Sequence, residues 1–281
     1  MPRPLASIII PTRNREVRIS AAIDSVLNQT QQNFELIVVD DGSTDATQEV
    51  LRAYGSRITC LRIDPAGPSA ARNRGIAAAQ ADLIAFLDSD DIWLQRKLEQ
   101  QLAHHSSNGD ILVSQTREVW MRNGVRVNAR AKHRMHSGWI YEHCLPLCIV
   151  SPSSVMIHRT VFEHVGLFDE SMPACEDYDL WLRIAPHYPI HLIDEELIIK
   201  YGGHADQQSR RIPALDCLRI KAICKSLESG DLNHDQRAAA VMELQRKCRI
   251  YAQGCRKRGK VDEAREYETK PHSYGPGPAS V

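Results

Sequence analysis

The stretch FELIVVDDGSTD, residues 34–45, contains the pattern that decides the fold. Residues 34–39 are mostly apolar and do not alternate with polar residues, which is typical of a strand buried on both faces. The run then breaks into polar residues and a glycine at 40–45. Similar apolar runs recur through the first hundred residues, and we expect four strands: 5–10, 34–39, 58–63 and 83–87.

Helical patterns lie between these runs. Residues 19–27 carry apolar side chains at the i, i+4, i+7, i+8 spacing of one helix face, and Ser43 or Thr44 can cap a helix that runs to about residue 53. Pro68 suits the first turn of a third helix, which runs to about residue 80. Strands that alternate with helices in this way form right-handed crossovers, so we predict an α/β fold with a mostly parallel central sheet flanked by helices.

The pattern changes past about residue 107. Arg122-Asn123-Gly124 is a good hairpin turn between two short apolar runs. After Gly202-Gly203, apolar residues recur every three or four positions, as they do in helices. In this part of the chain we expect strands at 110–115, 119–121, 125–127 and 154–158, and a helix at 177–184.

The bulk composition is that of an ordinary globular protein of 281 residues, with 43% hydrophobic and 25% charged residues. The 35 basic and 35 acidic residues give a formal net charge of zero, so the whole-chain charge does not indicate a nucleic-acid partner, and we expect none. Residues 209–260 are locally basic, with 13 Lys or Arg against 5 Asp or Glu. Two interpretations are open: a solvated helical surface, or contact with an anionic acceptor or membrane surface.

Eight cysteines occur without any C-x-x-C pair. Several are spaced four or seven residues apart on one helix face, and we interpret them as small buried side chains in a reducing compartment. The N-terminus shows no charged-then-apolar signal segment, and no apolar run reaches the ~20 residues of a membrane helix. We therefore expect a cytoplasmic protein, with contact at the inner face of the cell membrane as the alternative that the basic region leaves open.

A polar cluster follows each of the four expected strands. In a parallel sheet these carboxyl ends lie along one edge, where open α/β folds bind ligands. Clusters that are far apart in the sequence should therefore meet in space. The four clusters are residues 11–15, 40–45, 67–73 and 88–91.

The residue types in these clusters indicate a nucleotide. Asp40 and Asp41 can accept hydrogen bonds from a base or ribose, and arginines in the first and third clusters can contact phosphate oxygens. Asp88 and Asp90 lie two residues apart at a strand end, and such crowding at neutral pH requires a compensating charge. Mg²⁺ or Mn²⁺, held by one or two carboxylates and by phosphate oxygens, would supply it. Neither a Walker A loop nor G-x-G-x-x-G is present, which disfavours P-loop and dinucleotide sites.

Five motifs in a fixed order carry a family resemblance: SIIIPTRNRE, VVDDGSTDAT, PSAARNRGI, FLDSDDIW and ACEDYDLWLR. Together they resemble the family 2 glycosyltransferases, which have the GT-A fold, over roughly residues 5–210. The resemblance implies a nucleotide-diphosphate sugar as donor, a divalent cation, and transfer to an acceptor hydroxyl with inversion at the anomeric carbon. UDP is the default nucleotide because it is the commonest among similar enzymes.

The resemblance also implies roles for residues of the four clusters. Asp88 and Asp90 become the DxD pair, with Asp90 at the metal and Asp88 at both metal and donor. Asp91 is expected instead to cap the helix that follows Trp93. The donor-binding residues implied are Pro11, Thr12, Arg13, Arg15, Asp41, Arg72, Asp88 and Ser89.

The fifth motif offers the catalytic carboxylates. Attack at an anomeric carbon needs a base for the acceptor hydroxyl, and in the family's pattern this is the aspartate of the ED pair, which is Asp177 here. Glu176 would contact the acceptor or raise the basicity of its neighbour. We expect Asp179 to be a structural cap and Trp181 to pack in the core.

His204 lies between two glycines and a polar stretch, within residues 201–209. Glycines beside a histidine suggest a backbone that can approach a ligand. Related transferases often carry a histidine after the base helix that reaches the metal or diphosphate. We hypothesise that His204 is a third metal-side residue and that this loop closes over the bound donor.

These assignments divide the chain. We expect a GT-A domain at 1–210, with a nucleotide-binding half at 1–107 and an acceptor half at 108–210, then a helical C-terminal extension at 211–270 and a disordered tail at 271–281. The acceptor can be a glycan, a lipid-linked glycan or a cell-surface polysaccharide precursor. One alternative is a sugar-1-phosphate nucleotidyltransferase, which would normally carry a Gly-rich basic loop that PTRNRE lacks. The other is a catalytically silent module that binds a sugar nucleotide.

Overall fold

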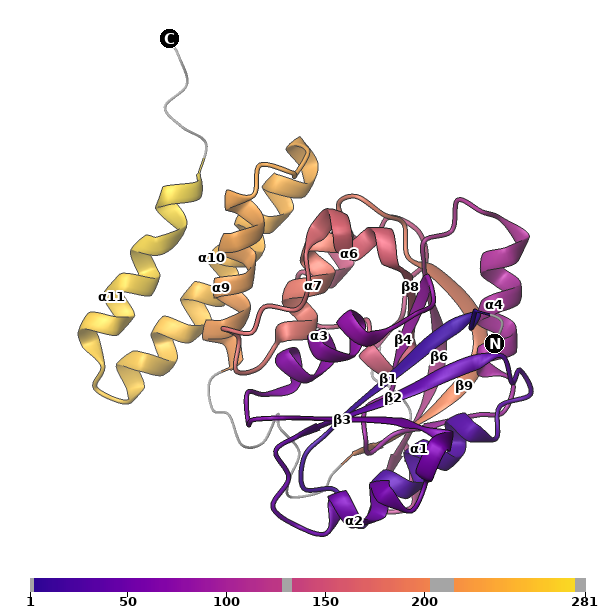
Figure 1. The fold of residues 1–281 in the computed structure, drawn as a ribbon. Coiled ribbons are helices and arrows are strands. Elements are labelled where there is room, and N and C mark those ends of the chain that lie inside the picture. The colour runs from indigo at the N-terminus through magenta and orange to yellow at the C-terminus, as the bar shows by residue number, and fades with distance from the viewer. Residues whose placement is uncertain (1–2, 128–132, 203–214, 276–281) are drawn as a thin grey trace.

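The computed structural model describes residues 3–127, 133–202 and 215–275. Within them the chain folds around one nine-stranded mixed sheet with helices on both faces, and α9, α10 and α11 extend from one side (Figure 1). The strand order is β3-β2-β1-β4-β8-β6-β9-β5, with β7 paired to β6. The predicted α/β class is confirmed.

The strands are β1 (Ala6–Thr12), β2 (Phe34–Asp41), β3 (Thr59–Ile63), β4 (Leu83–Phe86), β5 (Ile92–Trp93), β6 (Val113–Arg122), β7 (Val125–Val127), β8 (Val155–His158) and β9 (His191–Gly202). The α-helices are α1 (Ile19–Leu27), α2 (Thr47–Arg52), α3 (Pro68–Ala78), α4 (Lys97–Ser107), α5 (Tyr141–Cys144), α6 (Arg159–Val165), α7 (Glu176–Ile184), α9 (Leu215–Glu228), α10 (His234–Lys257) and α11 (Val261–Thr269). Short 3-10 turns occupy Gly55–Arg57 (η1), Pro152–Ser154 (η3) and Lys270–Tyr274 (η4).

The first four strands form the parallel part of the sheet. β1 pairs in parallel with both β2 and β4, and Ile9 lies opposite Ile37 and Phe86. Ile8 and Ile10 pack with the apolar residues of α1 and α4, whereas Ile9 packs on the other face with those of α3 and α7. Both faces of β1, β2 and β4 are buried, which is why these three strands show no polar alternation in the sequence. The expectation of a strand buried on both faces is wrong for β3, which lies at the edge of the sheet and is largely exposed.

One predicted helix start is wrong. The second helix begins at Thr47 rather than after Ser43 or Thr44, and its N-cap position, Ala46, makes no side-chain cap. The hydroxyl of Ser43 instead donates to the carboxylate of Asp40, which is completely buried. A buried carboxylate needs such donors, so Ser43 binds the carboxylate at the end of β2 and does not cap α2.

The second part of the sheet is mixed. β8 runs antiparallel to β4 and β6, while β6 and β9 are parallel with a bulge near Arg117. The predicted hairpin is present: Arg122 pairs with Val125, and Asn123 and Gly124 have φ of 51° and 76°, as a type I′ turn requires. The expected strands at 110–115 and 119–121 are one long strand, β6, which begins at Val113. The parallel character is therefore confined to the first four strands and the β6–β9 pair.

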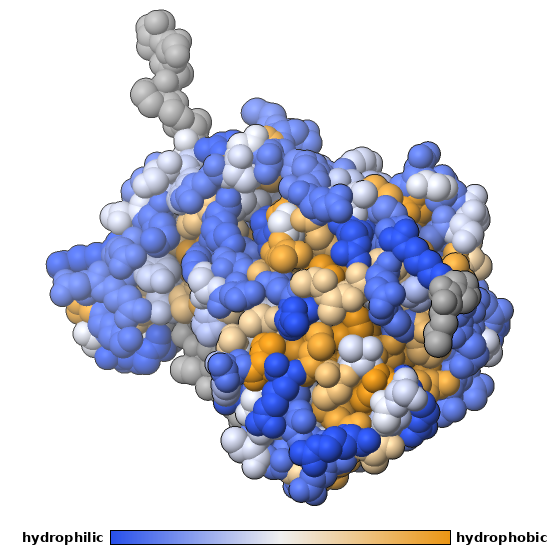
Figure 2. Space-filling view, in the orientation of Figure 1, coloured by the Kyte–Doolittle hydropathy of each residue, from blue (hydrophilic) through white to orange (hydrophobic). Residues whose placement is uncertain are grey.

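The C-terminal helices pack on the α/β core through α9 and α10. α10 begins with a capping box of Asn233 and Gln236 and buries one face, with Leu244, Cys248 and Cys255 almost fully covered. Lys225 of α9 ties this region to the core through the carboxylates of Asp169 and Asp179, both at 2.6 Å. The outer face is hydrophilic, whereas hydrophobic side chains gather over the sheet (Figure 2).

Two further findings concern the C-terminal region. Residues 271–274, expected in the tail, belong to the turn η4, and Tyr274 donates a hydrogen bond to Glu228. None of the helices in the described ranges combines the length and apolar character needed to cross a bilayer.

Candidate functional site

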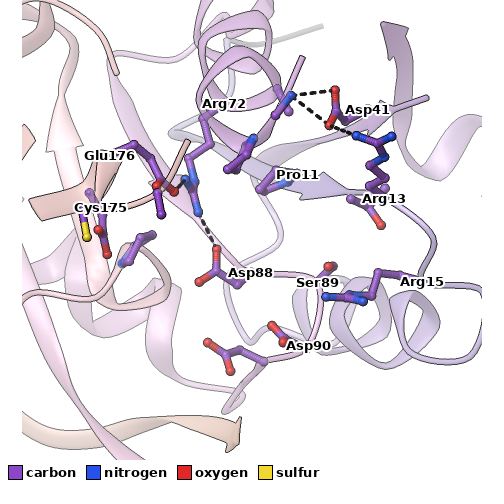
Figure 3. A pocket seen from close by; sticks show the side chains of 18 of the residues that line it. Pro11, Arg13, Arg15, Asp41, Arg72, Asp88, Ser89, Asp90, Cys175 and Glu176 are labelled. Carbon is purple, nitrogen blue, oxygen red and sulfur yellow. Dashed lines mark hydrogen bonds and ion pairs between the residues drawn. The ribbon is translucent and has the colours of Figure 1, made fainter. Parts of the chain in front are cut away.

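A cavity of about 830 Å³ opens at the edge of the sheet where β1, β2, β3 and β4 end. Its lining residues fall on two sides. The first side, the strand-end wall, consists of residues 11–15, Asp41, Gly67, and residues 88–91. The second side, the helical wall, consists of Cys148, Ala174, Cys175, Glu176, Asp177, Leu215 and Arg219. Figure 3 shows Cys175 and Glu176 on one side, Arg13 and Asp41 on the other, and Arg72 between them.

Asp41 organises the far end of the strand-end wall. Its carboxylate accepts hydrogen bonds from the backbone N–H groups of Ala66, at 2.6 Å, and Gly67, at 3.0 Å, and lies 3.6 Å from the guanidinium of Arg13. These bonds fix the loop after β3 against the end of β2. Gly67 has φ of 95°, a conformation open to glycine, and its backbone therefore forms part of the cavity surface.

The acidic loop after β4 presents its first two carboxylates differently from its third. Asp88 and Asp90 line the cavity and are partly exposed. Asp91 is 3% exposed and accepts hydrogen bonds from the hydroxyl of Ser153, at 2.7 Å, and from the N–H of Tyr201, at 3.3 Å. The expectation that Asp91 caps a helix is wrong, because α4 begins only at Lys97. Burial raises the pKa of Asp91 well above its usual range, against the opposing charge of Lys200.

The helical wall begins at a strained residue. Cys175, at the N-cap of α7, has φ of 59° and ψ of 23°, which is left-handed and uncommon for a residue with a side chain. This bend directs the first turn of α7, with Glu176 and Asp177, at the cavity. Asp177 accepts hydrogen bonds from the N–H of Tyr178, at 2.7 Å, and from the thiol of Cys148, at 3.3 Å.

Arg72 of α3 joins the two walls. Its guanidinium donates to Asp88, at 2.8 Å, and to Glu176, at 2.7 Å, and its side chain is 5% exposed. Burial opposes the positive charge, but the two carboxylates outweigh it and hold the pKa of Arg72 above its usual value. Burial also raises the pKa of Glu176, more than the Arg72 guanidinium lowers it. The site therefore holds a buried charge network centred on one arginine.

The lining residues that were not predicted from the sequence include Cys148, Lys200 and Arg219. Cys148 touches Asp177, as described above. Lys200 of β9 lines the cavity, with its ammonium 3.0 Å from the hydroxyl of Ser151; burial opposes its charge, but Glu118, Asp91 and Asp88 together raise its pKa. Arg219 of α9 lines it from the C-terminal extension. No local motif marks these residues, since they reach the cavity only through the tertiary fold.

The predicted residues gather as expected, with one outside the described ranges. All of the predicted donor-binding residues, the DxD pair and the two catalytic carboxylates line this single cavity. His204 lies outside the described residues. Asp179, expected as a cap, is 1% exposed and instead binds Arg183, at 2.9 Å, and Lys225. Trp181 is fully buried in the core, as predicted.

Asp88 and Asp90 have the chemistry of a site for a divalent cation. Carboxylate oxygens are the ligands that Mg²⁺ and Mn²⁺ prefer, and Mg²⁺ commonly uses one or two of them together with substrate phosphates. Among the described residues, no group of three or more His, Cys, Asp or Glu side chains could hold a metal alone. The carboxylates of Asp88 and Asp90 therefore fit a cation that is shared with a phosphate-bearing ligand.

Comparisons with known proteins give consistent results. The sequence model of the family described as "Glycosyl transferase family 2" matches residues 7–166. An uncharacterized glycosyltransferase of Rickettsia felis is 33% identical over 216 residues, which is 74% of this chain and 36% of that protein. The chain thus spans about a third of the length of that relative.

A relative of similar length to the chain has a named activity. The Escherichia coli UDP-Glc:alpha-D-GlcNAc-diphosphoundecaprenol beta-1,3-glucosyltransferase WfgD is 38% identical over 182 residues, covering 64% of this chain and 69% of that protein. Among solved structures, S. aureus TarS 1-349 in complex with UDP superposes with a TM-score of 0.68 at 16% identity, covering 95% of this chain and 91% of that one. The likeness to TarS concerns the fold.

Proposed function

The chain belongs to glycosyl transferase family 2 and has the GT-A fold, and from this premise we propose that it transfers a sugar from a UDP-sugar to the hydroxyl of a lipid-linked glycan, with inversion at the anomeric carbon. The named Escherichia coli relative uses UDP-glucose and an acceptor linked to a lipid diphosphate, which supports this choice of substrates. Transfer to such an acceptor would occur at a membrane surface.

One observation carries the proposal. The carboxylates of Asp88 and Asp90 on one wall and of Asp177 on the other open into the same cavity, with Arg72 bonded to both walls. A displacement reaction needs a site for the leaving group on one side of the reacting carbon and a base on the other. The two walls would supply these two sites.

The strand-end wall is proposed to hold the donor. Pro11, Thr12 and Asp41 would border the nucleoside, since Asp41 is already fixed beside the Gly67 loop. Arg13 and Arg15 offer cationic groups to the diphosphate. Asp88 and Ser89 would border the ribose and the diphosphate. We also retain His204 as a hypothesis for the metal side.

Asp90 and Asp88 would hold the divalent cation, Mg²⁺ or Mn²⁺, which when bound offsets the negative charge of the diphosphate leaving group. Asp177 is proposed to take the proton from the acceptor hydroxyl as that oxygen bonds to the anomeric carbon and the carbon–diphosphate bond breaks. The Cys148 thiol and the N–H of Tyr178 orient this carboxylate. Glu176 and Arg72 set its electrostatic surroundings.

The test is product analysis with UDP-glucose, UDP-N-acetylglucosamine and a GDP-sugar, each with and without Mn²⁺, in the presence of a GlcNAc-diphosphate lipid. We expect nucleoside diphosphate and a glycosylated lipid from a UDP-sugar only when Mn²⁺ is present. Formation of UTP and sugar 1-phosphate from a UDP-sugar when pyrophosphate is added would point instead to a sugar-1-phosphate nucleotidyltransferase. Donor binding with neither product from any sugar would identify a silent binding module.

A further inference from the structure

One cation of the helical wall has no role in the proposed reaction. Arg219 lies on α9, in the C-terminal extension and beyond residues 7–166, where the family model matches. It nevertheless lines the same cavity as the carboxylates of the proposed reaction. Its position in the cavity and its remaining bonding capacity indicate what it binds.

Arg219 lies at the end of the cavity remote from the proposed nucleotide site. The first turn of α9 adjoins Cys175, whose sulfur is 4.0 Å from the carbonyl oxygen of Leu215. Burial and the carboxylate of Asp177 raise the pKa of the Cys175 thiol to about 12, and the nearby Arg219 guanidinium opposes this shift. Figure 3 shows Cys175 on the side opposite Arg13 and Asp41. A ligand group that meets Arg219 therefore lies on the acceptor side of Asp177.

The guanidinium of Arg219 is only partly used. Within the described residues its one ion pair is with Asp216, at 3.1 Å through a single Nη1, and its Nε has no hydrogen-bond partner. The side chain is 22% exposed, and no ion pair within the described ranges links it to Asp177 or Glu176. A guanidinium has five N–H donors, and among the described residues only Nη1 of this one is bonded, which leaves Nη2 for a ligand.

Arg72 differs from Arg219 in how many of its terminal nitrogens are bonded. Both of its terminal nitrogens are bonded to carboxylates, which leaves it a structural charge. Arg13 and Arg15 belong to the donor end. Lys200 also lines the cavity, but it pairs with Glu118, at 3.9 Å, and lies near the further carboxylates of Asp91 and Asp88. Arg219 is thus the cation that a group beyond Asp177 would meet, and a planar guanidinium suits the oxygens of a phosphate.

We propose that Arg219 binds a phosphate group of the acceptor, carried next to the sugar whose hydroxyl is activated by Asp177. This inference rests on the proposed function and specifies its acceptor as anionic. It also gives the locally basic C-terminal region a defined contribution: one of its cations forms part of the substrate site, and α9 is a wall of that site.

The test measures binding at the acceptor end while UDP and Mn²⁺ fill the donor end. The probes are α-D-GlcNAc 1-phosphate and free GlcNAc, titrated by calorimetry into the UDP–Mn²⁺ complex of the full chain. We expect the sugar phosphate to bind about tenfold tighter than the free sugar, because charge-assisted hydrogen bonds are the stronger ones. Arg219→Gln should remove this preference, and Arg219→Lys should keep part of it.

Arg246→Gln is the matched control, because Arg246 lies in the same extension, is exposed and does not line the cavity. It should keep the full preference, and all variants should keep the wild-type affinity for UDP. Equal affinity of the wild-type protein for the two probes, or an unchanged preference in Arg219→Gln, would overturn the inference. Weaker UDP binding in Arg219→Gln would also overturn it, by assigning Arg219 to the donor. If the wild-type protein binds no UDP, the proposed function fails first and this inference falls with it.

Discussion

The two walls of the cavity are built in different ways. The strand-end wall comes from loops that directly follow parallel strands, so each residue is positioned by a strand within a few residues of it. The helical wall is assembled from the segment after α5, the first turn of α7 and the first turns of α9, which only tertiary packing brings together. Arg72 is the side chain that bonds to both.

This difference affects how freely the residues of each wall can change. A loop at a strand end keeps its place as long as the strand is buried, so its polar residues can be preserved as a motif. A wall made of helix termini depends on how α7 and α9 pack, and it can change with the packing. We therefore expect the donor chemistry to reside in the strand-end wall and the choice of acceptor in the helical wall.

The largest effect should come from the base. Asp177→Asn removes the proton acceptor on the helical wall and should lower turnover by about 10²- to 10⁴-fold, the usual contribution of a positioned base. Affinity for UDP and Mn²⁺ should be unchanged, as measured by calorimetry. A loss of UDP binding in this variant would place Asp177 on the donor side and erase the division between the walls.

The reciprocal change is Asp90→Asn on the strand-end wall. It should lower turnover by about a thousandfold, because the cation supplies several kcal/mol of charge stabilisation. Unlike Asp177→Asn, it should also weaken UDP binding in the presence of Mn²⁺ while binding without metal changes little. Turnover near the wild-type rate would contradict the assignment of the metal to this wall.

The link between the walls can be cut with Arg72→Met, which keeps the aliphatic stem but leaves Glu176, 6% exposed, without its counter-charge. Breaking a buried ion pair on one side should cost about 3–5 kcal/mol of unfolding free energy, measured by urea denaturation. The double variant Arg72→Met/Glu176→Gln removes the stranded charge and should recover part of this loss. If the double variant is as unstable as the single one, the ion pair is not the cause.

Acid should affect the mixed part of the sheet, through His105 of α4, more than the parallel part. His105 contacts the carbonyl of Ile111, at 2.8 Å, and the hydroxyl of Ser114, at 2.9 Å, and burial lowers its pKa to about 4. The pKa of His105 in the folded state lies below its unfolded value of about 6.5. The contribution of the neutral imidazole to the free energy of unfolding is therefore complete above pH 6.5 and is lost as the pH falls toward 4. Between pH 7 and pH 4, the wild-type protein should lose about 3 kcal/mol more stability than His105→Gln.

The smallest effect compares two helical glycines. A Cβ on Gly75 of α3 would lie 2.4 Å from Cγ2 of Ile9 in β1, so Gly75→Ala should destabilise by about 1–2 kcal/mol through overpacking. A Cβ on Gly254 of α10 would meet the movable guanidinium of Arg258, at 3.3 Å, and Gly254→Ala should stabilise by up to about 1 kcal/mol. Thermal denaturation of both variants gives the contrast. Equal shifts would show that α3 is not closely packed on β1.

Much of the strand-end wall could be predicted from the sequence because its signals are local. The apolar run of residues 34–39 and the polar residues that follow it are adjacent in the chain, and parallel-sheet geometry predicts the rest. The two helix caps predicted at Ser43 and Asp91 are wrong because other partners compete for the same side chains. The hydroxyl of Ser43 donates to the buried carboxylate of Asp40 and does not cap a helix. The carboxylate of Asp91 accepts hydrogen bonds from Ser153 and from the N–H of Tyr201 and does not cap α4.

The helical wall could be predicted only where a motif marks it. Glu176 and Asp177 lie in such a motif, whereas Cys148, Lys200 and Arg219 reach the cavity through contacts between distant elements. The basic surplus of the C-terminal region was visible in the composition, but its location relative to the cavity depends on how α9 packs against α7. Nothing in the periodicity of an isolated helix distinguishes Arg219 from the basic residues around it.

The bridge made by Arg72 has a thermodynamic consequence, which is linkage between cation binding at one wall and the pKa of a carboxyl group on the other. A cation that engages Asp88 would add positive charge near Glu176 and leave Arg72 with Glu176 as its remaining carboxylate partner. Both changes favour the ionised form of Glu176, whose pKa burial now holds above its usual value. Occupation of one wall by a cation would therefore lower the pKa of Glu176 on the other wall.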